Sequence, residues 1–209
     1  MHTFISRFIR RLARPIARVF LGLARASLLS FLFVAATTSN AQEPETVEVS
    51  SSVFDHLGMV PDEFSGYGAN TSIDLSWTNL PKGTAQLALI CDDPKVVELG
   101  MMSAPFVHWV GYNIPASASG LPQGMASDAE VTGIIGLEGM INGVNGLGRT
   151  GYFGPRPPVN GQLHAYHFRV YALDADLALA PGLNAEELRA AMDGHVLASG
   201  MLMGHYERK

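Results

Sequence analysis

Cysteine is almost absent from this chain, which excludes a fold held together by internal disulfides. Cys91 is the single cysteine among 209 residues, so no disulfide can form within one molecule. It ends the apolar run 87–91. A cysteine in such a run is typical of a buried core thiol, because a reactive thiol needs a base or a cation beside it.

Acidic residues are missing from the first 41 positions, which contain six arginines. An apolar run follows at residues 26–36, and the small residues Ser39 and Ala41 come after it. A basic start, a short apolar run and a small-x-small exit predict a secretory signal peptide, residues 1–41, cleaved after Ala41. The run is about half of the roughly 20 residues that a membrane span needs. An uncleaved N-terminal anchor is the alternative interpretation.

Basic residues are scarce in the rest of the chain. Removing residues 1–41 takes away six of the 14 basic residues and none of the 19 acidic ones, so residues 42–209 carry a net charge of −11. By charge, such a segment is a poor partner for nucleic acid or for an anionic lipid surface. Its length suits one domain with a proper core, and we expect no membrane span after signal removal.

Helical periodicity is also scarce, and short strand patterns take its place. Alternating or continuously apolar runs predict strands at residues 74–78, 86–91, 106–114 and 164–173. One helix is predicted from Asn184, whose side chain can form a capping box with Glu187, up to Gly194. A second short helical piece is predicted over residues 195–203. Several short strands and little helix together predict a mainly β fold, a sandwich with a small helical tail.

The stretch 148–174 organises the chain. Its first half is rich in glycine and proline, which excludes regular structure and predicts a stiff loop. Its second half alternates as a strand, with His164 and Tyr166 as the first residues on the inward face. A rigid loop that feeds a strand with polar inward residues is typical of a binding site at the mouth of a pocket. Arg149 and Arg156 flank this mouth, where they can attract an anion or pair with surface carboxylates.

Polar side chains gather where the predicted strands end. Asp92 and Asp93 end one strand, His108 lies near the start of the next, and His164 and Tyr166 open the strand after the proline loop. If the sheet brings these ends together, histidine and tyrosine donors can hold a phosphate-like anion while an aspartate orients an imidazole. The predicted ligand-binding residues are Asp93, His108, His164 and Tyr166. With histidine donors, affinity should rise as the pH falls toward about 6.

Other chemistries are less well supported by the sequence. His164 and His167 face opposite sides of a strand and cannot readily share a metal ion. The glycine pattern at 146–151 lacks a preceding strand and a following helix, so no dinucleotide or other cofactor is expected. A triad of Ser103, His108 and Asp93 can be drawn on paper, but no nucleophile elbow surrounds the serine. No catalytic residue is therefore predicted.

Several segments together resemble the phosphatidylethanolamine-binding protein family, and more narrowly its bacterial branch, often called Raf kinase inhibitor-like. The resemblance covers roughly residues 85–208. The segments that carry it, in chain order, are CDDPKV, PFVHWVGYNIP, GRTGYFGPRPP, LHAYHFRVYALD and GHVLASGMLMGHYER.

The resemblance implies a large central antiparallel sheet packed against a smaller one, with short C-terminal helices. It also implies a surface pocket for phosphate or a phospholipid headgroup, to which Asp93, His108, His164 and Tyr166 correspond. The chain departs from the family motifs at five positions: Lys95, Val97, Arg156, Gln162 and Ala165.

The sequence thus predicts a periplasmic or secreted binding protein for a small anionic ligand. Two rival functions stay open. The first is inhibition of a secreted peptidase or another enzyme through surface loops, which would make a protein the partner. The second is a hydrolase in which Asp93 and a histidine act as the base.

Overall fold

The structure is a computed structural model that describes residues 46–208. The predicted signal peptide, residues 1–41, lies outside the described residues. The elements in chain order are β1 (Glu48–Ser50), a 3-10 helix η1 (Asp62–Phe64), β2 (Leu75–Thr78), β3 (Gln86–Asp93), α1 (Lys95–Glu98), β4 (Phe106–Pro115), β5 (Gly120–Leu121), β6 (Ile141–Asn142), β7 (His164–Leu173), α2 (Ala185–Met192) and β8 (Val196–Tyr206). Among the described residues, no helix has the length and hydropathy that a bilayer crossing requires.

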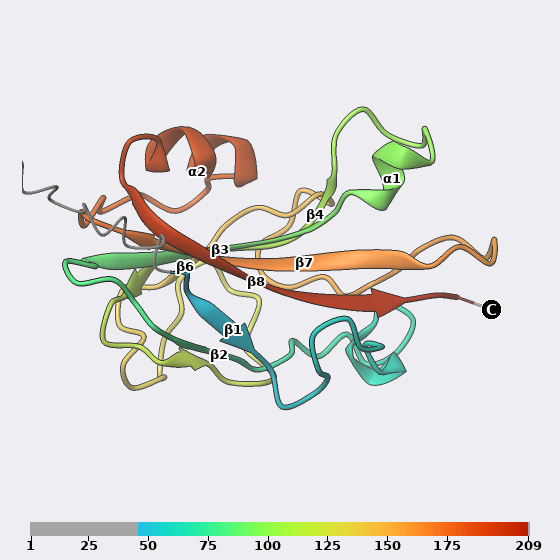
Figure 1. The fold of residues 1–209 in the computed structure, drawn as a ribbon, viewed down its shortest axis with the longest axis horizontal. Helices are drawn as coiled ribbons and strands as arrows, with labels where there is room; N and C mark the ends of the chain where they lie inside the picture. Colours follow the sequence, from blue (N-terminus) through green and yellow to red (C-terminus); the bar gives the residue numbers. More distant parts are fainter. Residues whose placement is uncertain (1–45, 209) are drawn as a thin grey trace, which may run out of the picture. The chain divides into compact units, whose positions relative to one another are not determined.

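Two antiparallel sheets form the domain, as the resemblance implies. The larger has the strand order β6-β4-β3-β7-β8, and the smaller has the order β1-β2-β5. Figure 1 shows the small sheet against one face of the large sheet and α2 against the other. All four strands predicted from the sequence are present, and the fold is mainly β.

The central strand, β3, is buried along its whole length, as its continuous apolar run predicts. It pairs with β4 on one side and β7 on the other. Cys91 lies near its end and is 1% exposed, and burial raises the pKa of its thiol. The predicted buried cysteine is therefore confirmed.

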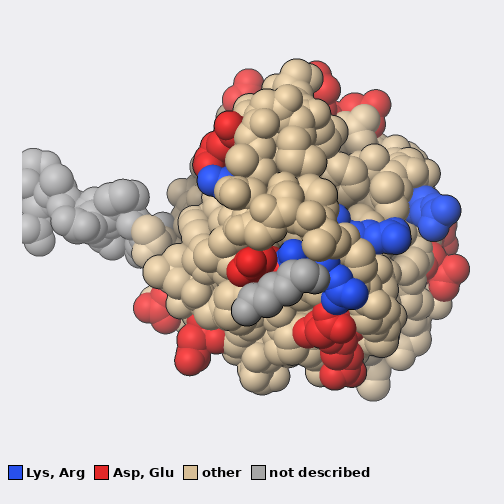
Figure 2. All heavy atoms as spheres, turned by 90° about the vertical axis from the view of Figure 1, so that its right-hand side faces the viewer, with Lys and Arg blue, Asp and Glu red and all other residues tan. Residues whose placement is uncertain are grey.

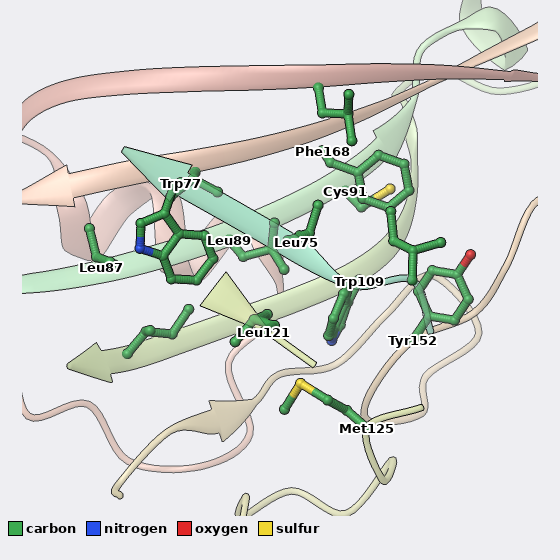
Figure 3. Packing of buried hydrophobic residues seen from close by; sticks show 14 of the residues in the cluster. Leu75, Trp77, Leu87, Leu89, Cys91, Trp109, Leu121, Met125, Tyr152 and Phe168 are labelled. Atoms are coloured by element: carbon green, nitrogen blue, oxygen red, sulfur yellow. The ribbon is translucent and has the colours of Figure 1, made fainter. Parts of the chain in front are cut away.

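Hydrophobic side chains fill the space on both faces of the large sheet. The larger cluster lies between the two sheets and includes Trp77, Trp109 and Phe168 (Figure 3). The smaller cluster lies under α2, where Leu188 and Met192 pack against side chains of the large sheet. The Asn184 side chain caps α2 by accepting hydrogen bonds from the backbone N–H groups of residues 186 and 187. The predicted capping box with Glu187 is present.

The prediction of a second helical piece at residues 195–203 is wrong, because this segment belongs to the strand β8. Ala198, Leu202 and Tyr206 are buried at a spacing of four, which imitates a helix. Gly200 and Gly204 occupy inward positions between them. A Cβ on Gly200 would overlap the carbonyl oxygen of residue 47, and one on Gly204 would crowd residues 54 and 60. The glycines therefore allow close packing over a strand rather than interrupt a helix.

The topology brings the polar strand ends together. β3 ends at Asp93, which pairs with Phe106 at the start of antiparallel β4. β7 also runs antiparallel to β3, and its first residue, His164, lies at the same end of the sheet. In Figure 1 this end lies on the right, beside α1. Three separated segments of the chain therefore supply side chains to one place.

Candidate ligand-binding site

Asp93 lies at the end of β3 and is almost fully buried. Its Oδ1 accepts the backbone N–H of Lys95 (2.9 Å), and its Oδ2 lies 2.6 Å from Nδ1 of His164. Because a carboxylate accepts hydrogen bonds, Nδ1 of His164 carries the hydrogen. Asp93 therefore orients this imidazole and leaves Nε2 for other partners, which is the arrangement that the sequence led us to expect of the aspartate.

His164 and Tyr166 are the first two inward residues of β7, whose burial alternates as predicted. Within residues 46–208, two buried side-chain polar atoms have no hydrogen-bond partner, and they are His164 Nε2 and the Tyr166 hydroxyl. Burial, followed by the charge of Asp93, raises the pKa of Tyr166 far above its usual value. The phenol therefore stays protonated and can donate a hydrogen bond. Since buried polar atoms are normally paired, these two atoms indicate a place for a ligand or for water.

His108 lies on β4 and has a fixed orientation. Its Nδ1 lies 2.7 Å from the carbonyl oxygen of Phe153, and the two rings stack with an interplanar angle of 1°. Tyr166 and Phe106 meet the imidazole edge-on. Burial lowers the pKa of His108 to about 4. At neutral pH the ring is therefore uncharged, and Nε2 carries a lone pair because the hydrogen is on Nδ1.

This protonation state corrects one expectation from the sequence. Both histidines were expected to donate a hydrogen bond to an anion, but near neutral pH the free nitrogen of His108 is an acceptor. Nε2 of His164 likewise holds a lone pair when Nδ1 donates to Asp93. Sequence alone does not reveal the difference, because the tautomer depends on a carbonyl group 45 residues away in the chain.

The four predicted residues line one cavity of about 280 Å³. Mostly apolar side chains complete its wall, and Arg156 contributes a permanent positive charge. The additional lining residues are Val96, Met101, Met102, Phe106, Leu147, Phe153, Arg156, Pro157 and Pro158. Arg149, which the sequence placed at the mouth together with Arg156, is not among them. Met101 and Met102 were assigned no role in the sequence analysis. Their place in the loop between two predicted strands that both carry site residues could have indicated that they line the cavity.

The loop that precedes β7 is fixed by contacts with residues 64–70. Tyr67 donates its hydroxyl hydrogen to the carbonyl oxygen of Pro157 (2.6 Å), and Gly154 N–H donates to the side chain of Asn70 (2.8 Å). A Cβ on Gly154 would overlap the carbonyl oxygen of Phe64, so only glycine fits there. The loop is therefore well held, as its glycine and proline content predicted.

Arg156 lies at the edge of the cavity and also contacts Tyr67. Its guanidinium carbon is 5.5 Å from the centre of the Tyr67 ring, and that of Arg208 is 4.5 Å from the same centre. Figure 2 views the molecule from this end, where Lys and Arg side chains lie in the centre and at the right, and Asp and Glu side chains lie beside them and around the margin of the view. Arg156 supplies a positive charge at the cavity itself, which a negatively charged ligand would meet as it binds.

Asp92 does not belong to the cavity, although it was grouped there with Asp93. Asp92 and Asp93 are consecutive residues of β3 and face opposite sides of the sheet, and the Asp92 side chain contacts Arg169 (2.6 Å) and Arg189 (2.9 Å). His167 lies beside this group, 3.9 Å from Asp92. The opposite facing of His164 and His167 is thus confirmed, and the two aspartates have separate environments.

The catalytic triad drawn from the sequence is not assembled. Asp93 contacts His164 instead of His108, and His108 directs its Nδ1 to a backbone carbonyl. The aspartate–histidine contact needed to orient a general base toward Ser103 is therefore absent from this site.

Comparisons with known proteins agree with this architecture. The sequence profile described as phosphatidylethanolamine-binding protein matches residues 50–207. A UPF0098 protein of Methanothermobacter thermautotrophicus is 37% identical over 162 residues, which cover 78% of this chain and 99% of that protein. A candidate lipoprotein of Mycobacterium tuberculosis, LppC, is 33% identical over 176 residues, which cover 82% of this chain and 80% of that protein.

Two solved structures share the fold. A protein of Chlamydia trachomatis, described as a candidate phosphatidylethanolamine-binding protein homologue, is 32% identical with a TM-score of 0.65, over 79% of this chain and 99% of its own. Escherichia coli YbcL, described as a member of the mammalian family, has a TM-score of 0.69 and 24% identity over 78% of this chain and 99% of its own.

Proposed function

Because the chain belongs to the phosphatidylethanolamine-binding protein family, we propose that it is a binding protein whose cavity takes a phosphate-like group, either free or as the headgroup of a small ligand. The observation that carries this proposal is the pair of unpartnered buried atoms, His164 Nε2 and the Tyr166 hydroxyl, in one cavity. A phosphate-like group that carries both free oxygens and an acidic hydrogen would give both of them partners: a ligand oxygen accepts from the Tyr166 hydroxyl, and a ligand O–H donates to Nε2 of His164, which holds a lone pair because Nδ1 carries the hydrogen. Arg156 at the edge supplies the charge that favours an anion.

We also propose that the protein works in the cell envelope or outside the cell. The signal-peptide pattern of residues 1–41 supports this location, and one relative is a candidate lipoprotein. An exported protein with a headgroup pocket would meet its ligand at or near the outer surface of a membrane.

Ligand binding can be tested by thermal denaturation of the protein with inorganic phosphate, phosphoethanolamine and an uncharged control solute. A ligand present at about 100 times its dissociation constant should stabilise the folded state by roughly 2.7 kcal/mol. We expect both phosphate compounds to raise the Tm of the parent, but not of a variant that combines His108→Ala with His164→Ala. The exposed His195, which pairs with Asp174 elsewhere on the molecule, provides the control variant His195→Ala.

The two rival functions make different predictions, one in a phosphoester turnover assay and the other in the thermal denaturation experiment. A hydrolase would turn over a phosphoester and lose turnover in His164→Ala, whereas a binding protein would leave the ester intact. An inhibitor that acts through surface loops would show no response to phosphate while the parent and the double variant both remain folded. Either result would overturn the proposal.

A further inference from the structure

Resting on the proposed function, we propose that the cavity binds its oxyanion in a protonated form. The acidic O–H of the ligand donates to the Nε2 lone pair of His108, and the Tyr166 hydroxyl donates to another ligand oxygen. The ligand class is therefore a hydrogen phosphate or a phosphate monoester that retains at least one acidic hydrogen. A fully deprotonated oxyanion such as sulfate is disfavoured.

The tautomer of His108 follows from its hydrogen-bond partner. The carbonyl oxygen of Phe153 can only accept a hydrogen bond, so Nδ1 of His108 must carry hydrogen. The backbone strengthens this arrangement, because the N–H of Phe153 donates to the carbonyl oxygen of His108 (2.8 Å). Two hydrogen bonds and a stacked ring thus connect the same two residues. The imidazole cannot present an N–H at Nε2 without taking up a second hydrogen.

Burial keeps this imidazole neutral, and the charged groups around it do not reverse the effect. The titratable and charged groups on its side of the fold are Asp93 from β3, His164 and Tyr166 from β7, and Arg156 from the preceding loop. Asp93 already accepts hydrogen bonds from His164 and Lys95. Burial is the main cause that lowers the pKa of His108 to about 4, and a positive charge on His164 would lower it further. No charged neighbour therefore favours the imidazolium form at neutral pH.

The cavity offers two imidazole acceptors, Nε2 of His108 and Nε2 of His164, beside the Tyr166 donor, so it matches a ligand that carries at least one acidic hydrogen. A dianion placed against His108 would bring an oxygen lone pair toward a nitrogen lone pair in a buried site, which is unfavourable. A ligand O–H in the same place forms a hydrogen bond. Tyr166 supplies the complementary donor, because its hydroxyl is buried, protonated and unpartnered. A site built to hydrogen-bond a ligand O–H discriminates strongly against analogues that lack it.

The proposal predicts how affinity depends on pH. The bound complex holds one hydrogen more than the free dianion and neutral His108. Affinity for a phosphate monoester should therefore fall about tenfold per pH unit above the second pKa of the ligand, which is about 6. A phosphonate with a higher second pKa should show the same fall at a correspondingly higher pH. Sulfate should bind appreciably only as the pH falls toward about 4, where His108 itself gains a hydrogen.

Isothermal titration calorimetry of the full chain tests this with inorganic phosphate, phosphoethanolamine, methylphosphonate and sulfate between about pH 4.5 and pH 8, a range that spans the second pKa of a phosphate monoester. We expect sulfate to bind at least roughly tenfold more weakly than phosphate near pH 6. We also expect the pH at which affinity begins to fall to follow the second pKa of each ligand. Equal affinity for sulfate, or one midpoint shared by all ligands, would overturn the inference and leave the proposed function standing. Failure of every oxyanion to bind at any pH would overturn both. The comparison of free phosphate with phosphoethanolamine shows which source of the headgroup is preferred.

Two substitutions separate the acceptor from the rest of the cavity. In His108→Asn, the amide nitrogen can still donate to the carbonyl oxygen of Phe153, but the Nε2 acceptor is removed. We expect this variant to reduce the preference for phosphate over sulfate, because the acceptor at Nε2 of His164 remains. Tyr166→Phe removes only the donor and should lower the affinities for phosphate and for sulfate by a similar factor. The control Tyr171→Phe, on the other face of the same strand, should leave both affinities unchanged. A preserved phosphate preference in folded His108→Asn would overturn the acceptor role.

Discussion

Asp93 accepts two hydrogen bonds, and this double role makes it sensitive to a substitution of nearly identical shape. One carboxylate oxygen accepts from the backbone of Lys95, and the other accepts from His164. In Asp93→Asn the side chain retains one acceptor oxygen and gains an NH₂ group, so one of the two buried donors loses its partner. We expect a loss of roughly 1–3 kcal/mol in the free energy of unfolding, measured with urea.

The pair of Asp174 and His195 provides the matched control, because its contact distance is 2.9 Å and its side chains are 47% and 42% exposed. Asp174→Asn should change the free energy of unfolding by no more than about 0.5 kcal/mol. Equal effects of the two substitutions would contradict the role given to Asp93.

His108 should make the stability of the protein depend on pH in one direction. Its pKa is about 4 in the folded state, whereas a solvated histidine side chain has a pKa of 6.5, so the unfolded state binds more hydrogen ions between these two values. Stability from this residue is complete above about pH 6.5 and is lost as the pH falls toward 4. Between about pH 7 and pH 5 the loss should be about 2 kcal/mol.

Urea denaturation of the parent and of His108→Asn at both pH values checks this, because asparagine does not titrate in the range. The difference in stability between the two proteins should change with pH in favour of the parent at neutral pH. A constant difference would contradict a buried, neutral His108.

At the scale of elements, β8 shows why one part of the fold escaped prediction. The apolar residues at 198, 202 and 206 have helical spacing, and only the tertiary structure shows that glycines fill the inward positions between them. By contrast, the alternation in β7 and the continuous apolar run in β3 predicted these two strands correctly, because their burial follows directly from sequence period.

Gly200 offers a test of this explanation. In Gly200→Ala the new methyl group would meet the backbone of Val47, which cannot move aside as a flexible side chain could. We expect a loss of about 1–3 kcal/mol in the free energy of unfolding. Ser199→Ala, the exposed neighbour on β8, should have little effect. If Gly200→Ala is as stable as the parent, the close contact between Gly200 and the backbone of Val47 does not explain why glycine occupies this position.

At the scale of the whole molecule, most of the candidate site could be predicted because three strand ends carry unusual polar residues for a buried sheet edge. Asp93, His108, His164 and Tyr166 were all identified in this way, and they line one cavity. The separation of Asp92 from Asp93 could also have been predicted, because neighbouring residues of a strand face opposite sides of the sheet. The tautomer of His108 could not be predicted, because it depends on a distant carbonyl group.

Export is the prediction that concerns the chain as a whole. When the full chain is produced in a bacterium with a general secretory pathway, the envelope fraction should contain a protein that begins at Gln42. Intact-mass measurement and N-terminal sequencing would show this. A protein in that fraction that retains residues 1–41 would support the uncleaved anchor instead.

The single thiol in the centre of the large sheet gives the protein a natural reporter of its own opening. Cys91 is buried on the central strand, and the raised pKa of its thiol further slows reaction with alkylating reagents. Labelling should therefore require that β3 be exposed, so its rate at fixed pH measures the population of open molecules. Phosphate should slow the labelling by the same factor by which it shifts the folding equilibrium. No engineered probe is needed, because the chain has no second cysteine to report a different event.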